Sequence, residues 1–344
     1  MGLSERKKKI LKAVVEENLR AAEPVSSQKI VDSYMSDVSS ATIRNELMAL
    51  EEMGLLYHPH TSSGRLPTSE GLKRYVEELM PTRKLTVKEL AAIKSTFDNK
   101  INNLEDALRR TAKTISDATD YASVVYTGLS DEAEIDSIQL FKVTDDLALV
   151  IVMTDVGIIK DLTMRCSLSD AECKQASKVI TRVFAGKTLG EVRPDAFEID
   201  NEIAAFKGVF NEIVKLIIER NKDFDDRFEV SGQEKLLNYP EYQDLKKFKN
   251  ALQVIDKKEK LVPLLDNGGN VEISIKIGGD GDIEDCSLVS AVYKVNGKQV
   301  GSAGVIGPVR MDYAKAVSVL KGVAKTLEEN MSDYLKGEDN ERKR

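Results

Sequence analysis

Residues that bind metals or act as nucleophiles are scarce in this sequence of 344 residues. It contains two histidines and three cysteines, and the cysteines, Cys166, Cys173 and Cys286, form no Cys-x-x-Cys pair. Because a structural zinc site needs about four Cys or His ligands at short spacings, we expect no metal site and reduced, buried thiols. No nucleophile stands with a general base either, so we expect neither an enzyme nor a bound cofactor.

Long apolar runs are also missing, so we expect no membrane-spanning helix. The basic N-terminus, residues 1–9, precedes an amphipathic segment rather than the apolar core of a signal peptide, and we therefore expect a cytoplasmic protein. Positive charge is in deficit, since the formal net charge is −7 at pH 7. This argues against a nonspecific nucleic-acid coat protein. It does not argue against a sequence-specific DNA-binding protein, because the local placement of charge decides that attraction.

The first 80 residues have the pattern of three helices followed by a small hairpin. Apolar residues recur at helical spacing over residues 4–20, and hydroxyl side chains that can cap a helix precede two further helical segments. Gly54 is placed to end the third helix. An extended segment, a polar loop over residues 58–64 and another helical segment follow. This order predicts a winged helix-turn-helix DNA-binding domain at residues 1–80.

The third of these helices carries side chains suited to reading base edges. Ile43, Leu47 and Leu50 fall on one face and are expected to pack on the first two helices. On the opposite face an arginine can donate two hydrogen bonds to guanine, an asparagine can pair with adenine, and the serines at the helix start can hold a phosphate. The predicted DNA-contacting residues of this helix are Ser39, Ser40, Ala41, Thr42, Arg44, Asn45 and Met48. An ordinary amphipathic helix with a solvated face is the alternative.

The loop after this helix, residues 58–65, contains no carboxylate but holds both histidines, three hydroxyl groups and an arginine. Such a segment can lie against a phosphate backbone without repelling it, and we expect Arg65 to enter a minor groove. The two histidines have no third ligand nearby, which argues against a metal site. The predicted DNA-contacting residues of the loop are His60, Thr61, Ser62, Ser63 and Arg65.

The rest of the chain alternates between helical and strand-like patterns. Residues 81–120 are typical of a helical connector, strand-like segments occupy parts of 121–167 and 228–336, and residues 168–227 return to helix. One interpretation is a single α+β domain interrupted by a helical insertion, and the other is two consecutive domains. The sequence leaves both open. Residues 337–344 form a charged tail that we expect to be disordered.

A wide apolar stripe marks the last helix of the inserted segment. It is formed by six residues at helical spacing: Phe206, Val209, Phe210, Ile213, Leu216 and Ile217. A dimer places two recognition helices in successive major-groove turns, which multiplies specificity, so this stripe is our candidate dimer interface. A core helix inside a single chain is an equally good interpretation.

Several segments resemble the HrcA family of heat-inducible repressors. In the N-terminal region the similar segments are Pro24–Ser27, Val38–Leu47, Leu50–Leu56 and Pro59–Thr68, together with Gly71 and Arg74–Val76. Further along the chain they are Ser231–Gly232, Leu236–Leu237, Pro240–Tyr242 and Gly307–Tyr313. The similarity thus spans nearly the whole chain, and the run at 59–68 is too long and too unusual in composition to be expected by chance.

The resemblance implies a negative regulator of chaperone operons that binds an inverted-repeat operator as a homodimer. It also implies a GAF-like α+β domain, residues 121–167 and 228–336, interrupted by a mainly helical dimerising insertion at 168–227. The partner that it implies is the chaperonin GroEL, which keeps such a repressor active until heat stress occupies the chaperonin with unfolded proteins.

Two other functions remain as alternatives. A transcription factor that senses a metabolite through the GAF-like domain would show an operator affinity that depends on the ligand. An enzyme that uses a winged helix only for docking would need a catalytic constellation, which the sequence does not display.

Overall fold

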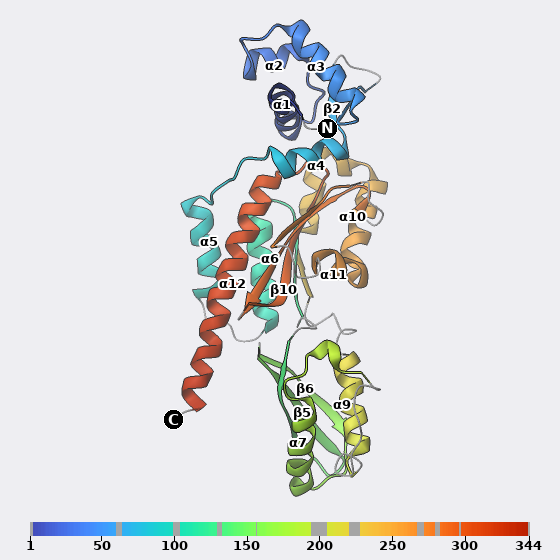
Figure 1. The fold of residues 1–344 in the computed structure, drawn as a ribbon, viewed down its shortest axis with the longest axis vertical. Coiled ribbons are helices and arrows are strands. Elements are labelled where there is room, and N and C mark those ends of the chain that lie inside the picture. The colour runs from blue at the N-terminus through green and yellow to red at the C-terminus, as the bar shows by residue number, and fades with distance from the viewer. Residues whose placement is uncertain are drawn as a thin grey trace.

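The computed structural model of the protein is elongated, with three parts arranged along its long axis (Figure 1). It describes residues 3–59, 64–98, 104–128, 133–155, 157–193, 205–219, 228–266, 272–278, 283–295 and 297–342. The N-terminal helices lie at one end, a five-stranded sheet with its helices lies in the middle, and a three-stranded sheet lies at the other end. The fold is therefore α+β with several sheets, as the sequence patterns predict.

The N-terminal part consists of short helices and a small antiparallel sheet. Its elements are α1 (Glu5–Ala21), α2 (Ser27–Tyr34), α3 (Ser40–Glu52), β1 (Leu56–Tyr57), β2 (Leu66–Pro67) and α4 (Ser69–Glu78). Each of these helices follows a Ser or Thr whose side chain accepts a hydrogen bond from the backbone amide three residues further on. Such caps satisfy amide groups that have no partner within the helix, so the hydroxyl residues set where each helix begins.

Apolar side chains from these helices share one core. Ile10 and Val14 of α1 are fully buried, as is Ile43 of α3, and the two helices pack directly on each other. α4 approaches the end of α3 closely at Gly71, where a Cβ atom would lie 2.0 Å from the carbonyl oxygen of Leu55. Only glycine fits at this contact, which fixes α4 against the segment that leaves α3.

The middle part is built on an antiparallel sheet with the strand order β7-β3-β10-β9-β8. Its strands are β3 (Ala122–Thr127), β7 (Phe228–Ser231), β8 (Ile273–Lys276), β9 (Ser287–Val295) and β10 (Lys298–Gly307). β9 and β10 form a hairpin in which Val295 is paired with Lys298. β3 lies between β10 and β7, so the sheet joins segments from distant parts of the chain.

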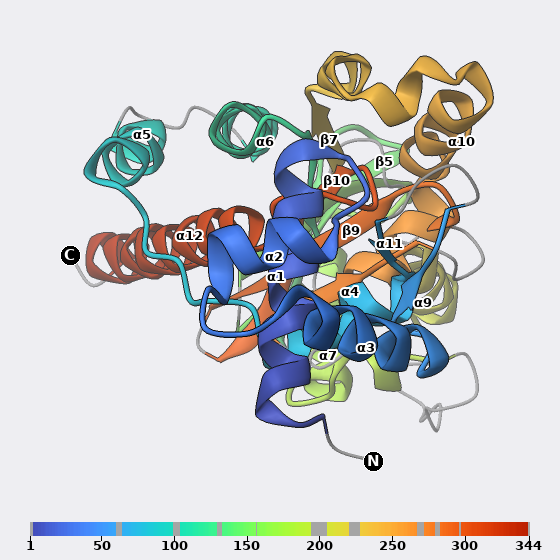
Figure 2. The same cartoon turned by 90° about the horizontal axis from the view of Figure 1, so that it is seen from above.

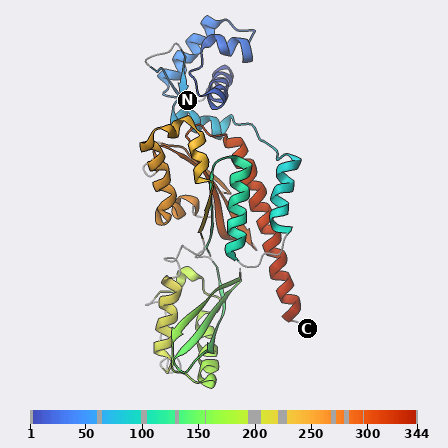
Figure 3. The same ribbon diagram turned by 180° about the vertical axis from the view of Figure 1, so that it is seen from behind.

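Helices cover both faces of this sheet. On one side lie α5 (Val87–Asp98), α6 (Leu104–Thr119) and α12 (Tyr313–Arg342), packed side by side (Figure 3). On the other side lie α10 (Leu245–Asp256) and α11 (Lys258–Asp266). Successive residues of a strand point to opposite faces, so Val124 is buried in the cluster with α10 and α11, and Val125 in the cluster with α6 and α12. The segment predicted as a helical connector is thus packed as a layer of this part.

The C-terminal helix extends further than the sequence predicts. α12 runs to Arg342, so residues 337–342 are helical rather than a disordered tail. Gly337 lies within the helix and does not end it, because a glycine costs a helix only about 1 kcal/mol relative to alanine.

The third part contains a separate antiparallel sheet with the order β4-β5-β6. Its elements are β4 (Ile135–Lys142), β5 (Leu147–Thr154), β6 (Gly157–Arg165), α7 (Asp170–Phe184), η1 (Leu189–Glu191) and α9 (Lys207–Glu219). Residues 121–167 were predicted to belong to the GAF-like domain. The structure places residues 135–165 in their own sheet instead, packed against α7. Tight turns join these strands, so each pairs with its neighbour in sequence.

α9 turns the predicted apolar stripe towards the inside of this part. Four residues of the stripe are at most 8% exposed: Phe206, Phe210, Ile213 and Ile217. The other two, Val209 and Leu216, are half-buried. The ring centroid of Phe210 lies 5.3 Å from that of Phe184 in α7. Side chains that are buried within one chain have no surface left for a second copy. The stripe is therefore a core face, the second of the two interpretations, rather than the predicted dimer interface.

Candidate nucleic-acid interface

α3 lies at the outer end of the molecule together with α2, as the view down the long axis shows (Figure 2). Ser39 caps the helix, because its Oγ accepts a hydrogen bond from the amide of Thr42 at 3.2 Å. The Oγ atoms of Ser27 and Ser40 lie 3.0 Å apart, which connects α2 to the start of α3. At the other end Gly54 has a φ of 73°, a left-handed conformation that lets the chain leave the helix without strain.

The two faces of α3 are as different as the sequence predicts. Ile43, Leu47 and Leu50 are at most 4% exposed, which confirms the predicted inner face. On the opposite face the predicted DNA-contacting residues fall into an exposed group, Ser39, Ala41, Arg44, Asn45 and Met48, and a half-buried group, Ser40 and Thr42. The structure thus brings all seven helix residues together on one accessible surface, with Arg44 and Asn45 adjacent.

Buried charge fixes the helices that support α3. Glu17 of α1 is 6% exposed and accepts hydrogen bonds from Tyr34 at 2.9 Å and from Arg20 at 2.8 Å. Lys29 of α2 pairs with the same carboxylate at 3.6 Å. Burial, followed by the hydrogen bond to Glu17, raises the pKa of Tyr34 to about 12. α1 and α2 are therefore joined by a neutralised polar cluster, which fixes the position of the two helices that α3 packs against.

The carboxylate in the N-terminal half of α3 is neutralised by α1. Glu46 Oε2 lies 2.7 Å from Nζ of Lys7, and its Oε1 lies 3.6 Å from Nη1 of Arg6. The side chain of Arg6 is 52% exposed, so a solvent-exposed cation lies beside Glu46 of α3. Arg6 and Lys7 are not among the predicted DNA-contacting residues. The signal in the sequence that points to them is the basic run at residues 6–9.

Arg65 does not project from the loop as the sequence analysis expected. Its Nε donates a hydrogen bond to Glu51 of α3 at 2.9 Å, and its side chain is 15% exposed. Its backbone exchanges hydrogen bonds with Val25 in an isolated bridge, each at 2.9 Å. In this structure Arg65 joins the end of the loop to α3, and its guanidinium is not placed to enter a groove.

The loop itself is closed by His58, whose Nδ1 lies 3.0 Å from the carbonyl oxygen of Gly64. The other predicted loop contacts, His60, Thr61, Ser62 and Ser63, lie outside the described residues. The loop starts at the end of β1 and leads into β2, so it is attached to the side of α3.

In the part of the chain that the structure describes, no group of three or more His, Cys, Asp or Glu side chains is arranged to hold a metal ion. Within the same residues, no helix is both long and apolar enough to span a membrane.

The chain matches the sequence model of the family described as the HrcA protein C-terminal domain over residues 105–317. A heat-inducible transcription repressor HrcA from Pelotomaculum thermopropionicum is 34% identical over 345 residues, covering 98% of this chain and 99% of the relative. The protein of the same name from Clostridioides difficile is 35% identical over 329 residues, covering 93% and 97%.

A solved structure described as a hypothetical protein at 2.2 Å resolution has a similar fold, with a TM-score of 0.59 over 96% of this chain and 99% of that one. Its identity of 24% supports the fold alone. The relatives are transcription repressors rather than enzymes, and they include the N-terminal part that carries α3. From this coverage and identity, the chain belongs to the HrcA family of heat-inducible transcription repressors.

Proposed function

We propose that the chain represses heat-shock operons by placing α3 in the major groove of an inverted-repeat operator. In this proposal residues 1–80 are a winged helix-turn-helix domain, in which α2 and α3 form the helix-turn-helix and the β1–β2 loop forms the wing. The observation that carries the proposal is the exposed face of α3, where Arg44 and Asn45 stand free of contacts with the core while Glu46 is neutralised.

The chemistry of this face supports sequence-specific binding. Arg44 can donate two hydrogen bonds to a guanine and Asn45 can pair with an adenine, and each such pair discriminates against a wrong base by about 1–3 kcal/mol. Ser39 and Ser40 lie at the helix N-terminus, where free backbone amides and the helix dipole attract a phosphate. Contacts to phosphates fix the position of the helix on the DNA, and contacts to base edges determine which sequence is bound.

The middle and third parts, which together we call the body, are proposed to be a GAF-like domain with a dimerising insertion. In this proposal the GAF-like domain is the five-stranded sheet with helices on both sides. The dimerising insertion is proposed to span 135–219, so that it includes the three-stranded sheet. The outer face of that sheet is the better candidate for a dimer interface. Phe141 of β4 is 51% exposed there, Val143, directly after β4, is 55% exposed, and Leu149, which pairs with Phe141 across the strands, is half-buried. Exposed apolar patches of this kind favour association.

The chaperonin GroEL is the proposed partner that sets the activity, in the cytoplasm, where the operator DNA is found. The family resemblance supports this part of the proposal. Under heat stress the chaperonin is occupied by unfolded proteins, the repressor is no longer kept active, and transcription begins.

The proposal is tested by a gel-shift titration at fixed salt of an inverted-repeat operator from the promoter region of a chaperone operon, with scrambled DNA as competitor. We expect the wild-type chain to prefer the repeat, and its active fraction to rise when GroEL is added. Arg44→Ala should lose most of the preference while retaining nonspecific binding. Equal affinity of the wild type for repeat and scrambled DNA, with and without GroEL, would contradict the proposal.

A further inference from the structure

Arg310 connects the N-terminal part to the body of the molecule. Its Nη1 donates a hydrogen bond to the carbonyl oxygen of Leu19, in α1, at 3.2 Å. Its Nη2 donates to Oε2 of Glu241, in the body, at 3.4 Å, and its Nε forms an ion pair with the same carboxylate. The side chains of Arg310 and Glu241 are 18% and 25% exposed, so solvent screens this contact only in part.

The end of α1 is a favourable place for such a cation. α1 ends at Ala21, and the amide of Ala22 donates to the carbonyl of Asn18, so the carbonyl of Leu19 is among the last four that have no partner within the helix. The C-terminal end of a helix also carries a partial negative charge. Arg310 therefore donates a hydrogen bond to a free carbonyl and places a positive charge at the negative end of the helix dipole. Both interactions hold the C-terminal end of α1 against the body.

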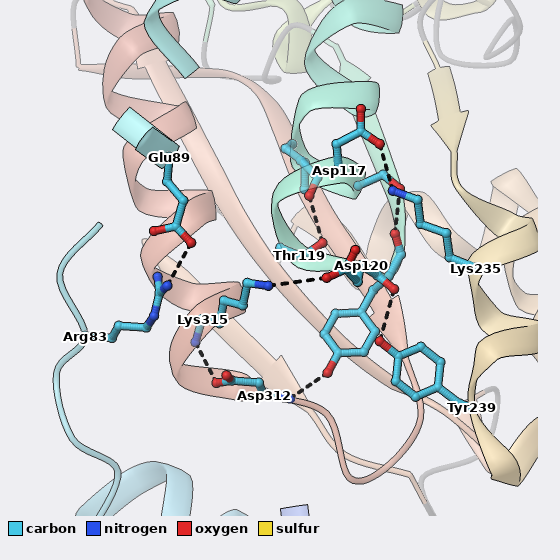
Figure 4. A network of polar contacts seen from close by, with 12 residues as sticks. Arg83, Glu89, Asp117, Thr119, Asp120, Lys235, Tyr239, Asp312 and Lys315 are labelled. Carbon is cyan, nitrogen blue, oxygen red and sulfur yellow. Dashed lines mark hydrogen bonds and ion pairs between the residues drawn. The ribbon is translucent and has the colours of Figure 1, made fainter. Parts of the chain in front are cut away.

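Arg310 is presented by a tightly held loop between β10 and α12. The amide of Asp312 donates a hydrogen bond to the hydroxyl of Tyr121 at 2.8 Å, and Oδ1 of Asp312 accepts one from the amide of Lys315 at 2.9 Å (Figure 4). Met311 is fully buried, and the hydroxyl of Tyr313 donates to the carbonyl of Val309. The loop is thus fixed to the end of α6 and to the start of α12.

Glu241 is anchored at the same corner of the body. It lies in the short helix η5 (Pro240–Gln243), next to Tyr239, whose ring stacks on that of Tyr121 with centroids 5.2 Å apart. The hydroxyl of Tyr239 also donates to the carbonyl of Asp120 at 3.1 Å (Figure 4). Arg310, which contacts α1, and Glu241, which pairs with Arg310, are therefore both positioned by residues packed around Tyr121.

The charge of this loop also acts on α4. Tyr75 of α4 is 4% exposed, and burial, followed by the charges of Glu16 and Asp312, raises its pKa. Asp312 belongs to the loop that presents Arg310.

We propose that Arg310 is a positioning residue for operator recognition: it fixes the angle of the N-terminal part on the body and thereby the spacing of the two recognition helices in a DNA-bound dimer. The inference rests on the proposed function. A dimer reads two half-sites at a separation set by its own geometry. Removing the Arg310 contact should therefore leave the contacts within one half-site intact and weaken the preference for one separation of the two half-sites.

The test compares operators whose half-sites keep their natural separation with operators lengthened by about five base pairs, half a helical turn. We expect the wild-type chain to bind the lengthened operator at least about tenfold more weakly, a typical size of coupling between two sites. In Arg310→Met this penalty should fall to less than about threefold, while affinity for an isolated half-site stays unchanged. Glu241→Gln keeps the shape of its side chain and should shift the penalty in the same direction, even if Arg310→Met folds poorly.

Lys235→Met is the matched control, because Lys235 is 20% exposed and pairs with Asp117 inside the body at 2.8 Å. It should retain the wild-type penalty. The inference is overturned if Arg310→Met and Glu241→Gln retain that penalty, or if Lys235→Met relaxes it equally. A wild-type chain that binds no inverted repeat overturns the proposed function and this inference together, whereas a wild-type penalty that both variants retain overturns only the inference.

Discussion

Replacing Glu46 with glutamine should strengthen nonspecific DNA binding and make it more sensitive to salt. In the wild-type chain this carboxylate holds Lys7 at 2.7 Å and Arg6 at 3.6 Å beside the exposed face of α3. Glutamine has nearly the same shape but no charge, so both cations become available to phosphates. The carboxylate that would repel the backbone is removed by the same change.

The magnitude follows from the number of cations released. Each cation that reaches a phosphate adds about 0.9 to the steepness of the logarithmic dependence of affinity on salt. For each protomer, we expect this steepness to increase by about 0.9 if one of Lys7 and Arg6 reaches a phosphate and by about 1.8 if both do. An increase of about 0.9 means that raising the salt from 50 to 200 mM lowers the affinity by a further factor of roughly 3.5. The free energy of unfolding should fall by about 1 kcal/mol. The side chains of Lys7 and Glu46 are 25% and 17% exposed, so solvent screens that pair only in part, whereas the pair with Arg6, which is 52% exposed, contributes little.

The assay is fluorescence anisotropy with scrambled duplex DNA over a series of salt concentrations. Asp145→Asn serves as the control, since Asp145 is fully exposed in the three-stranded part and its replacement changes the net charge by the same amount. The control should leave the salt dependence unchanged. Weaker binding by Glu46→Gln, or an unchanged salt dependence, would refute the assignment of Glu46 as the group that restrains these cations.

Three further predictions concern the core, the response to acid and the dimer. Ile43→Ala should lower the free energy of unfolding by about 2–5 kcal/mol in chemical denaturation, because it leaves a cavity under α3; a loss below 1 kcal/mol would contradict this. The hydrogen bond from Arg83 is the main cause that lowers the pKa of Glu89 from 4.5 to about 2, so its stabilisation is complete above pH 4.5 and is lost as the pH falls towards 2. Glu89→Gln should therefore weaken the acid dependence of stability in that window, and an unchanged dependence would remove this role. Phe141→Asp should give a monomer by light scattering with an unchanged circular dichroism spectrum, whereas a retained dimer would exclude the outer face of β4 and β5.

Local signals predicted α3 well. Ser39 has the side chain of a helix cap, Gly54 tolerates a left-handed turn, and Ile43, Leu47 and Leu50 recur at the helical period, so one segment of sequence contains its start, its end and its inner face. Every contact that decides these features lies within a few residues along the chain. The structure accordingly agrees with the sequence at these positions.

Long-range partners were not predictable in the same way. The strand at 135–142 is buried mainly on one face, and the strand at 122–127 is buried on both. Neither pattern names a partner, yet the strands at 135–165 pair with one another and the strand at 122–127 pairs with β10, far along the chain. An alternating pattern states that one face of a strand is buried but not which strand lies beside it. The stripe on α9 has the same limit, because an apolar helix face packs equally well on its own chain or on a second copy.

Arg65 and Glu46 show how this limit affects a functional surface. From residue type alone, Arg65 was predicted to contact DNA, and Glu46 was assigned no role. In the folded chain Arg65 is paired with Glu51, and Glu46 is paired with Lys7 and Arg6. The charge that a DNA backbone meets is the charge left after these pairs have formed. A chain with a net charge of −7 can therefore present a helix whose exposed face carries Arg44 and whose nearby carboxylate, Glu46, is already neutralised.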